Sequence, residues 1–138
     1  MVVKKSISLK TKGFTDILDI TQDVEKCLKG SGLKEGIVTV FVPGSTAAVT
    51  TLEYESGLIS DLRRALEIIA PQEGEYQHNL RWQDGNGFSH IRASLLGPSL
   101  TVPFSQGRLI LGTWQQIIFI DFDNRPRWRT LIVQIIGE

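Results

Sequence analysis

The sequence predicts an α+β fold, mostly antiparallel and sandwich-like, in a single domain that covers residues 1–138. Both segments with helical periodicity lie in the N-terminal half. About eight short strand-like segments are spread along the chain, and Gly and Pro turns separate those of the second half. A length of 138 residues suits one domain, and we find no linker or fixed-period repeat.

Strand-like patterns begin the chain and recur between the two predicted helices. Residues 4–10 alternate apolar and polar side chains, which is typical of a half-buried strand. Residues 36–42 and 47–52 are rich in β-branched side chains and are predicted as further strands. The pair Pro43-Gly44 breaks the pattern between them.

The two predicted helices have recognisable ends. Thr21 is the expected N-cap of the first helix, which Gly30 and Gly32 terminate. Ser56 is the expected cap of the second helix, which Pro71 stops. The second helix has an apolar stripe made of Leu58, Leu62, Ala65, Leu66 and Ile69.

The rest of the chain is predicted as one long loop followed by strands. Residues 72–89 are polar and lack clear periodicity, so we expect a functional loop there. The predicted strands that follow are 91–96, 99–102, 108–111, 116–122 and 127–136. Residues 117–120 are apolar on both strand faces, which predicts cover by a second sheet or by another subunit.

Composition limits the classes of function. Lys plus Arg and Asp plus Glu each number 15, so the formal net charge is zero, which argues against a nucleic-acid partner. Cys27 is the single cysteine, which excludes an intrachain disulfide and a cysteine-based zinc site. No apolar run in the sequence approaches the ~20 residues that are needed to span a membrane. The first residues also lack the apolar segment of a signal peptide. We therefore expect a cytoplasmic protein without a membrane partner.

The two histidines of the chain, His78 and His90, flank the long loop. Asp84 and Asn86 lie between them, and Glu53 precedes the second helix. Two imidazoles and a carboxylate with one open position form a common catalytic zinc or iron site. The spacing of the histidines fits no helical metal motif, and on spacing alone two surface histidines are the favoured reading.

Three further segments have a functional and a structural interpretation each. The turn at residues 43–46 can cradle a phosphate with backbone N–H groups, although a plain hairpin is favoured. Trp114, in a Gly-Thr-Trp-Gln turn, can stack on an aromatic ligand or contact a subunit. Arg125 and Arg127 can hold phosphate or form a solvated turn, and the solvated turn is favoured.

Several strings resemble the YjbQ-like family, which is also called the secondary thiamine-phosphate synthase family. They are Ala-Ser-Leu-Leu-Gly-Pro-Ser at residues 93–99, Gly-Arg-Leu at 107–109, Leu-Gly-Thr-Trp-Gln at 111–115, and the segment 86–90. The resemblance covers nearly the full chain. It implies a homotrimer with pockets between subunits and a weak synthase activity. That reaction joins a hydroxymethylpyrimidine diphosphate to a thiazole phosphate and releases diphosphate.

The resemblance also implies roles for individual residues. Glu53, His78 and His90 are the expected catalytic residues, and the two histidines are also the expected ligands of a divalent metal, zinc or magnesium. The expected contacts to a small phosphorylated heterocycle are Thr46, Asn86, Ser94, Thr113, Trp114 and Gln115, to which we add Arg127 for phosphate. The family often has His-Thr where this chain has Gly44-Ser45, and some members have His at the position of Phe88, so a three-histidine site cannot be built here.

Three hypotheses follow for the function. The first is an enzyme with its polar pocket near a trimer interface. The second is a non-catalytic trimer that binds a small ligand or a metal and whose synthase activity is incidental. The third is a structural interaction protein that associates through residues 117–120.

Overall fold

The computed structural model describes all 138 residues and confirms the α+β class. The elements in chain order are β1 (Val2–Thr11), β2 (Asp16–Asp19), α1 (Thr21–Ser31), β3 (Gly36–Phe41), β4 (Ala47–Leu52), α2 (Ser56–Ile69), α3 (Gln77–Trp82), α4 (Gly87–Leu96), β5 (Ser99–Ser105), β6 (Arg108–Leu109), β7 (Gln116–Asp121) and β8 (Arg127–Gly137). None of the helices has the length and apolar character needed to cross a membrane.

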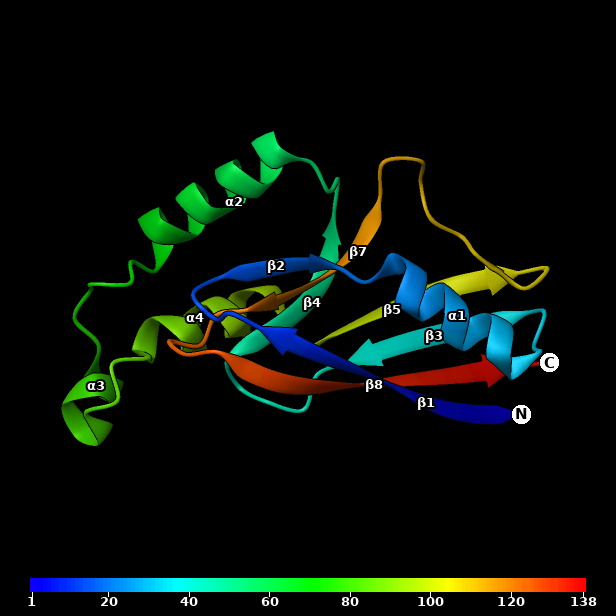
Figure 1. Cartoon of the computed structure of the whole chain (residues 1–138), viewed down its shortest axis with the longest axis horizontal. Coiled ribbons are helices and arrows are strands. Elements are labelled where there is room, and N and C mark those ends of the chain that lie inside the picture. The colour runs from blue at the N-terminus through cyan, green and yellow to red at the C-terminus, as the bar shows by residue number, and fades with distance from the viewer.

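The strands form two sheets in which every pair is antiparallel (Figure 1). The five-stranded sheet has the order β1-β8-β3-β5-β6, and the three-stranded sheet has the order β2-β7-β4. β1 pairs with β8 along its whole length, from Val2 opposite Ile136 to Thr11 opposite Arg127. The sequence did not predict β2, which occupies a polar stretch next to Gly13.

The central strand β7 is buried on both faces by parts of the same chain. Ile117 and Phe119 belong to the larger core, which includes residues of the five-stranded sheet and α1. Ile118 and Ile120 belong to a smaller core, to which Leu66 of α2 and others from α4 and β4 contribute. All four β7 residues are inaccessible to solvent. No second subunit is needed to cover this strand, so the third hypothesis loses its association surface.

The segment predicted as a long loop and a strand contains two helices. Residues 72–89 contain α3 and the start of α4, and the predicted strand 91–96 lies within α4. Burial within α4 repeats at helical spacing, because Phe88 and Arg92 are buried four residues apart. The guanidinium of Arg92 donates to Ala70 O, Thr15 Oγ1 and Glu67 Oε2. A prediction from periodicity assumes that buried positions are apolar. Arg92 is buried because residues far along the chain accept its hydrogen bonds, so the helical period of buried positions is not visible as a period of apolar residues.

Both predicted helix caps are wrong by one residue. The first helix has Ile20 at its N-cap, while the Thr21 hydroxyl donates to Asp19 and accepts from the N–H of Ile117. The second helix is capped by Glu55, whose carboxylate accepts from the first N–H groups of α2. Gly32 does terminate α1, in the left-handed conformation that glycine favours.

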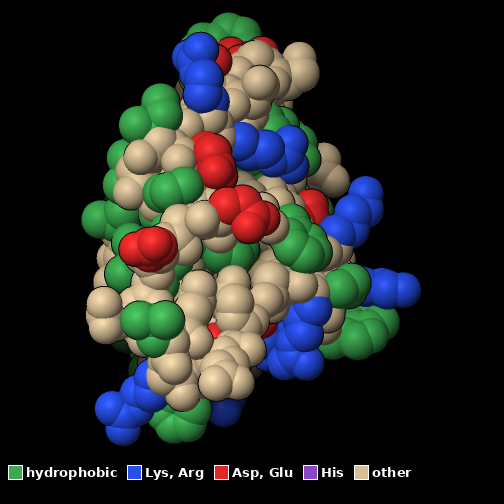
Figure 2. All heavy atoms as spheres, turned by 90° about the vertical axis from the view of Figure 1, so that its left-hand side faces the viewer, with side chains coloured by type: hydrophobic (Ala, Val, Ile, Leu, Met, Phe, Trp, Pro, Cys, Tyr) green, Lys and Arg blue, Asp and Glu red, His purple; other side chains and the backbone are tan.

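The predicted apolar stripe of α2 is only partly used within the chain. Leu66 is buried, whereas Ile69 is 64% exposed, and Ile68, which lies outside the predicted stripe, is 76% exposed. Leu80 and Trp82 of the neighbouring α3 are also exposed. Helix α2 lies at the periphery of the molecule in Figure 1, with Leu66 packed into the smaller core, and Figure 2 shows hydrophobic side chains spread among charged ones on this side. This side therefore exposes several large hydrophobic side chains.

Candidate functional site

The two histidines meet in space, although twelve positions separate them in the sequence. His78 lies on α3 and His90 on α4, and their ring centroids are 4.4 Å apart with the planes tilted by 53°. Nε2 of His78 lies 3.2 Å from the Asp84 carboxylate and 3.0 Å from the side-chain amide of Asn86. Asp84 and Asn86, between the two helices, thus hold the His78 ring against His90.

His90 lies where two cavities meet. One is a polar cavity of about 530 Å³ without any hydrophobic residue in its wall. Its wall includes the turn at residues 43–46 and the arginines at positions 125, 127 and 129. The second cavity, of about 320 Å³, has Ala47, Ala93 and Pro98 in its wall together with Ser94. His90 lines both cavities, as do the first two residues after Pro43 in the turn.

A buried ion pair between Arg129 and Asp121 holds part of the wall of the polar cavity in place. Arg129 binds both carboxylate oxygens of Asp121 at 2.8 Å and donates to the Thr46 hydroxyl at 2.7 Å. The Thr11 hydroxyl donates to the same carboxylate at 2.7 Å. Burial alone would raise the pKa of Asp121, but the hydrogen bonds from Arg129 and Thr11 outweigh it and lower that pKa. This network joins β1, β7, β8 and the turn before β4.

A second acid, Asp123, pairs with the arginines of the cavity wall. Its carboxylate accepts from Arg127 and from the backbone N–H of Asn124, and Arg125 lies 4.0 Å away. Burial would raise the pKa of Asp123, but these hydrogen bonds outweigh it and lower that pKa. Asp123 therefore carries a negative charge at neutral pH and orients Arg127 at the cavity.

The surroundings of His90 favour its neutral form, which can act as a base. Burial is the main cause that lowers its pKa from 6.5, and the neighbouring His78 lowers it further. The carboxylates of Asp84 and Asp123 act in the opposite direction and do not compensate. His90 is therefore neutral at neutral pH, with a ring nitrogen that can accept a proton or a hydrogen bond.

The remaining predicted site residues lie at the opposite end of the three-stranded sheet. β4 begins after Thr46 and ends before Glu53, and it pairs with β7 from Ala47 opposite Asp121 to Leu52 opposite Gln116. A six-residue strand spans roughly 20 Å. The Glu53 end also carries Thr113, Trp114 and Gln115, because this turn leads directly into β7. Within one chain, the structure does not bring these four residues to the histidines.

The turn that contains Trp114 is held to β4 but leaves the indole exposed. Gln115 accepts from the N–H of Gly112 at 3.0 Å, and its amide lies 3.4 Å from the Thr51 hydroxyl. Trp114 itself is 72% exposed. An exposed tryptophan on an anchored turn is suited to contact a ligand or a neighbouring subunit.

Sequence reasoning missed Asp121, Asp123 and Arg129. The sequence contains a pattern that indicates them. Charged residues occupy every second position from 121 to 129, with acids at 121 and 123 and arginines at 125, 127 and 129. Residues two apart in a strand point to the same face. The alternation around β8 therefore places Arg127 and Arg129 on one side of the sheet, toward the cavity.

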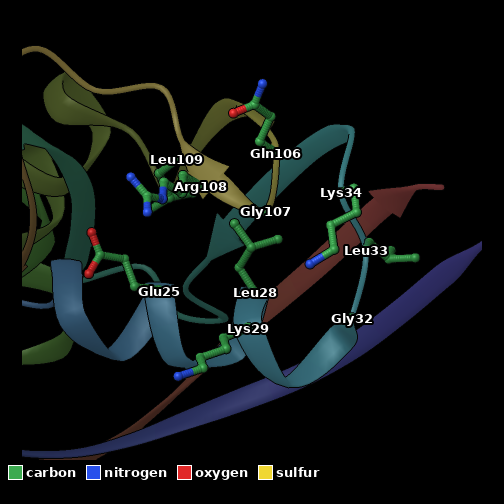
Figure 3. Close-up of a pocket in the computed structure, with 10 residues that line it drawn as sticks. All are labelled: Glu25, Leu28, Lys29, Gly32, Leu33, Lys34, Gln106, Gly107, Arg108 and Leu109. Atoms are coloured by element: carbon green, nitrogen blue, oxygen red, sulfur yellow. The ribbon is translucent and has the colours of Figure 1, made fainter.

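The largest cavity of the chain lies elsewhere and lacks this chemistry. It measures about 560 Å³ and lies between α1 and β6 (Figure 3). Lys29, Lys34 and Arg108 line it together with three leucine side chains. It contains neither a histidine nor a hydroxyl group, and Glu25 is its one carboxylate. We therefore place the candidate reaction site at His90.

The residues around His78 and His90 do not fit a metal centre with three protein ligands. No group of three or more His, Cys, Asp or Glu side chains in the chain is arranged to hold a metal ion. The Asp84 carboxylate forms a hydrogen bond with the His78 ring. The two groups therefore do not point together at an empty position that a metal ion could occupy.

Comparison with known proteins identifies the family of this chain. Residues 5–138 match the family model described as UPF0047 protein YjbQ-like. The chain belongs to the YjbQ-like family. It is 39% identical to a UPF0047 protein of Archaeoglobus fulgidus, with 94% of this chain and 98% of the relative covered. It is 41% identical to one from Methanothermobacter thermautotrophicus, with 99% and 94% covered.

A solved structure supports the same assignment for this YjbQ-like chain. The structure of a YjbQ-like protein from Sulfolobus solfataricus, described as being of unknown function, superposes with a TM-score of 0.95 at 34% identity. The superposition covers 100% of this chain and 99% of that chain. The sequence-based recognition of the family is therefore confirmed, and these relatives carry no named activity.

Proposed function

We propose that the protein is a weak thiamine-phosphate synthase that acts on a small phosphorylated heterocycle at the His90 cavity. The observation that carries this proposal is the position of His90, which lies between an arginine-lined polar cavity and a more apolar one. A substrate with a diphosphate at one end and a flat ring at the other has the polarity that these two cavities require.

The proposed reaction needs no oxidant or reductant. The bond between the pyrimidine methylene carbon and the diphosphate oxygen breaks, and the bonding electrons leave with diphosphate. The lone pair of the thiazole ring nitrogen forms the new carbon–nitrogen bond and gives a thiazolium product. Neutral His90 accepts a hydrogen bond from the amino group of the pyrimidine, which increases electron donation into the ring as diphosphate leaves. Arg127 stabilises the charge that develops on the leaving group.

We also propose that the complete site forms between subunits of a homotrimer. Glu53 and Trp114 lie at the opposite end of β4 and β7 from the histidines, so one chain supplies two half-sites. A neighbouring subunit can bring its Trp114 end to the His90 cavity. The exposed Trp114 and the apolar side formed by α2 and α3 are surfaces that such an assembly would cover.

A subunit-mixing experiment tests the enzyme and the shared site together. We expect that His90→Ala and Glu53→Gln trimers are each nearly inactive as synthases. When the two variants are unfolded, mixed in equal amounts and refolded, random assembly leaves about one quarter of the sites with both native halves. Synthase activity of the mixture should therefore recover to about that fraction of wild type.

The control is to mix the two purified trimers without unfolding, which should restore no activity as long as the subunits do not exchange. Mass measurement of each sample checks the oligomeric state. If refolded mixtures stay inactive while each variant remains trimeric, the shared site is wrong. If wild-type protein shows no synthase activity, the proposed reaction is wrong.

The alternative is a non-catalytic trimer that binds a small ligand or a metal. The close approach of His78 and His90 beside Asp84 is the observation that favours it. Metal analysis of native protein beside a His78→Ala/His90→Ala variant tests the metal. Because no three-ligand cluster is present, we expect less than one tightly bound zinc or magnesium per chain. About one metal per native chain, lost in the variant, would support this alternative instead.

A further inference from the structure

We infer that Nη1 of Arg129 and the backbone N–H groups of Gly44 and Ser45 form a subsite for the diphosphate group of the substrate. The inference rests on the proposed function, since it names which residues hold the leaving group. Arg129, Gly44 and Ser45 all line the polar cavity next to His90, and no role was expected for Arg129.

Arg129 keeps one nitrogen free for a ligand. Its side chain is only 5% exposed, and its Nε and Nη2 atoms bind Asp121 and Thr46. Nη1 makes no hydrogen bond within the chain. Because no fully buried side-chain nitrogen or oxygen lacks a partner, Nη1 retains accessible surface, and Arg129 lines the cavity. A buried guanidinium that is fixed on one side and open on the other is a preorganised anion donor.

The turn before β4 adds donors next to this nitrogen. The N–H groups of Gly44 and Ser45 donate to no backbone carbonyl, and both residues line the cavity. A Cβ placed on Gly44 would lie 3.0 Å from Nη1 of Arg129. Gly44 also has a φ of +155°, which side chains disfavour. The absence of a side chain here leaves the space in front of Nη1 open to a ligand.

The arrangement suits two linked phosphates better than one. Donors come from two separate segments, the turn at 44–45 and the arginines at 125–129. Arg127 is paired with Asp123, whereas Arg125 lies 4.0 Å from that carboxylate and is 68% exposed. A cavity of about 530 Å³ with a mostly polar wall has room for diphosphate, which can contact both segments at once.

Calorimetric titration with inorganic diphosphate and with inorganic phosphate tests the subsite. We expect wild-type protein to bind diphosphate more tightly than phosphate. Gly44→Ala fills the space before Nη1, and Arg129→Lys keeps the positive charge but removes Nη1. Each should weaken diphosphate binding by about 10- to 100-fold, the loss of one hydrogen bond to a charged group. Arg108→Gln, in the cavity between α1 and β6, is the matched control and should bind like wild type.

The outcomes separate the subsite from the proposed reaction. Equal affinity for phosphate and diphosphate, no binding of either at millimolar concentration, or an equal loss in Arg108→Gln would overturn the subsite. If Arg129→Lys does not fold, Gly44→Ala decides. Diphosphate binding that survives in His90→Ala, in a wild-type protein without synthase activity, supports the subsite and rejects the reaction. Synthase activity without diphosphate binding does the reverse.

Discussion

Replacement of His90 by alanine is expected to lower kcat/KM of the synthase reaction by about 10²- to 10⁴-fold, the usual contribution of a positioned acid or base. His90 is the one titratable side chain that lines both the polar and the more apolar cavity, so no neighbour can take over its role. The measurement is steady-state kinetics on variants whose thermal unfolding and oligomer mass match wild type. A variant that retains more than half of the activity would contradict the assignment.

The pH profile gives a second readout for the same residue. The pKa of His90 is lowered from 6.5, and in the proposed reaction its neutral form is the active one. Activity should therefore persist as the pH falls below 6.5 and decline only through the lower pKa of the folded protein. His78→Ala removes one cause of this lowering and should move the decline toward pH 6.5. An unchanged profile in His78→Ala would show that the two rings are not coupled.

Replacement of Arg129 by methionine is expected to lower the free energy of unfolding by about 3–5 kcal/mol, the cost of breaking a buried ion pair by removing one partner. Asp121 is inaccessible to solvent and would keep its charge with only the Thr11 hydroxyl and one backbone N–H as donors. For a domain of this size, the loss corresponds to a fall in Tm of roughly 10–20 °C. Denaturant and thermal unfolding at neutral pH and fixed protein concentration measure it.

A second variant tests whether the uncompensated charge of Asp121 causes the loss of stability. Asp121→Asn in the Arg129→Met background removes the uncompensated charge and should recover part of the lost stability. Arg108→Gln, an exposed arginine, should change the free energy of unfolding by less than about 0.5 kcal/mol. Because the pKa of Asp121 is held below 3.8, the contribution of the pair is present above that pH and is lost as pH falls through the folded pKa. A double variant no more stable than Arg129→Met would contradict this account.

Local sequence patterns predicted the correct element where the buried positions were apolar and followed the period of a strand or helix. The β-branched run before Pro43 became β3, and the doubly apolar run at 117–120 became the central strand of the smaller sheet. The same patterns failed in α4, where burial of Arg92 depends on partners from α2 and the segment before β2. A polar side chain buried by distant partners is invisible to hydrophobic periodicity.

For the site, the sequence alone determined the family, the α+β class and the residue types available for chemistry. Only the tertiary structure decided that the rings of His78 and His90 lie in contact, that Arg129 is buried with one nitrogen free, and that Glu53 and Trp114 lie at the far end of the sheet. The physical reason is that a linear pattern reports which side chains prefer the interior. Distances between such side chains depend on strand pairing and helix packing, which join residues far apart in the chain.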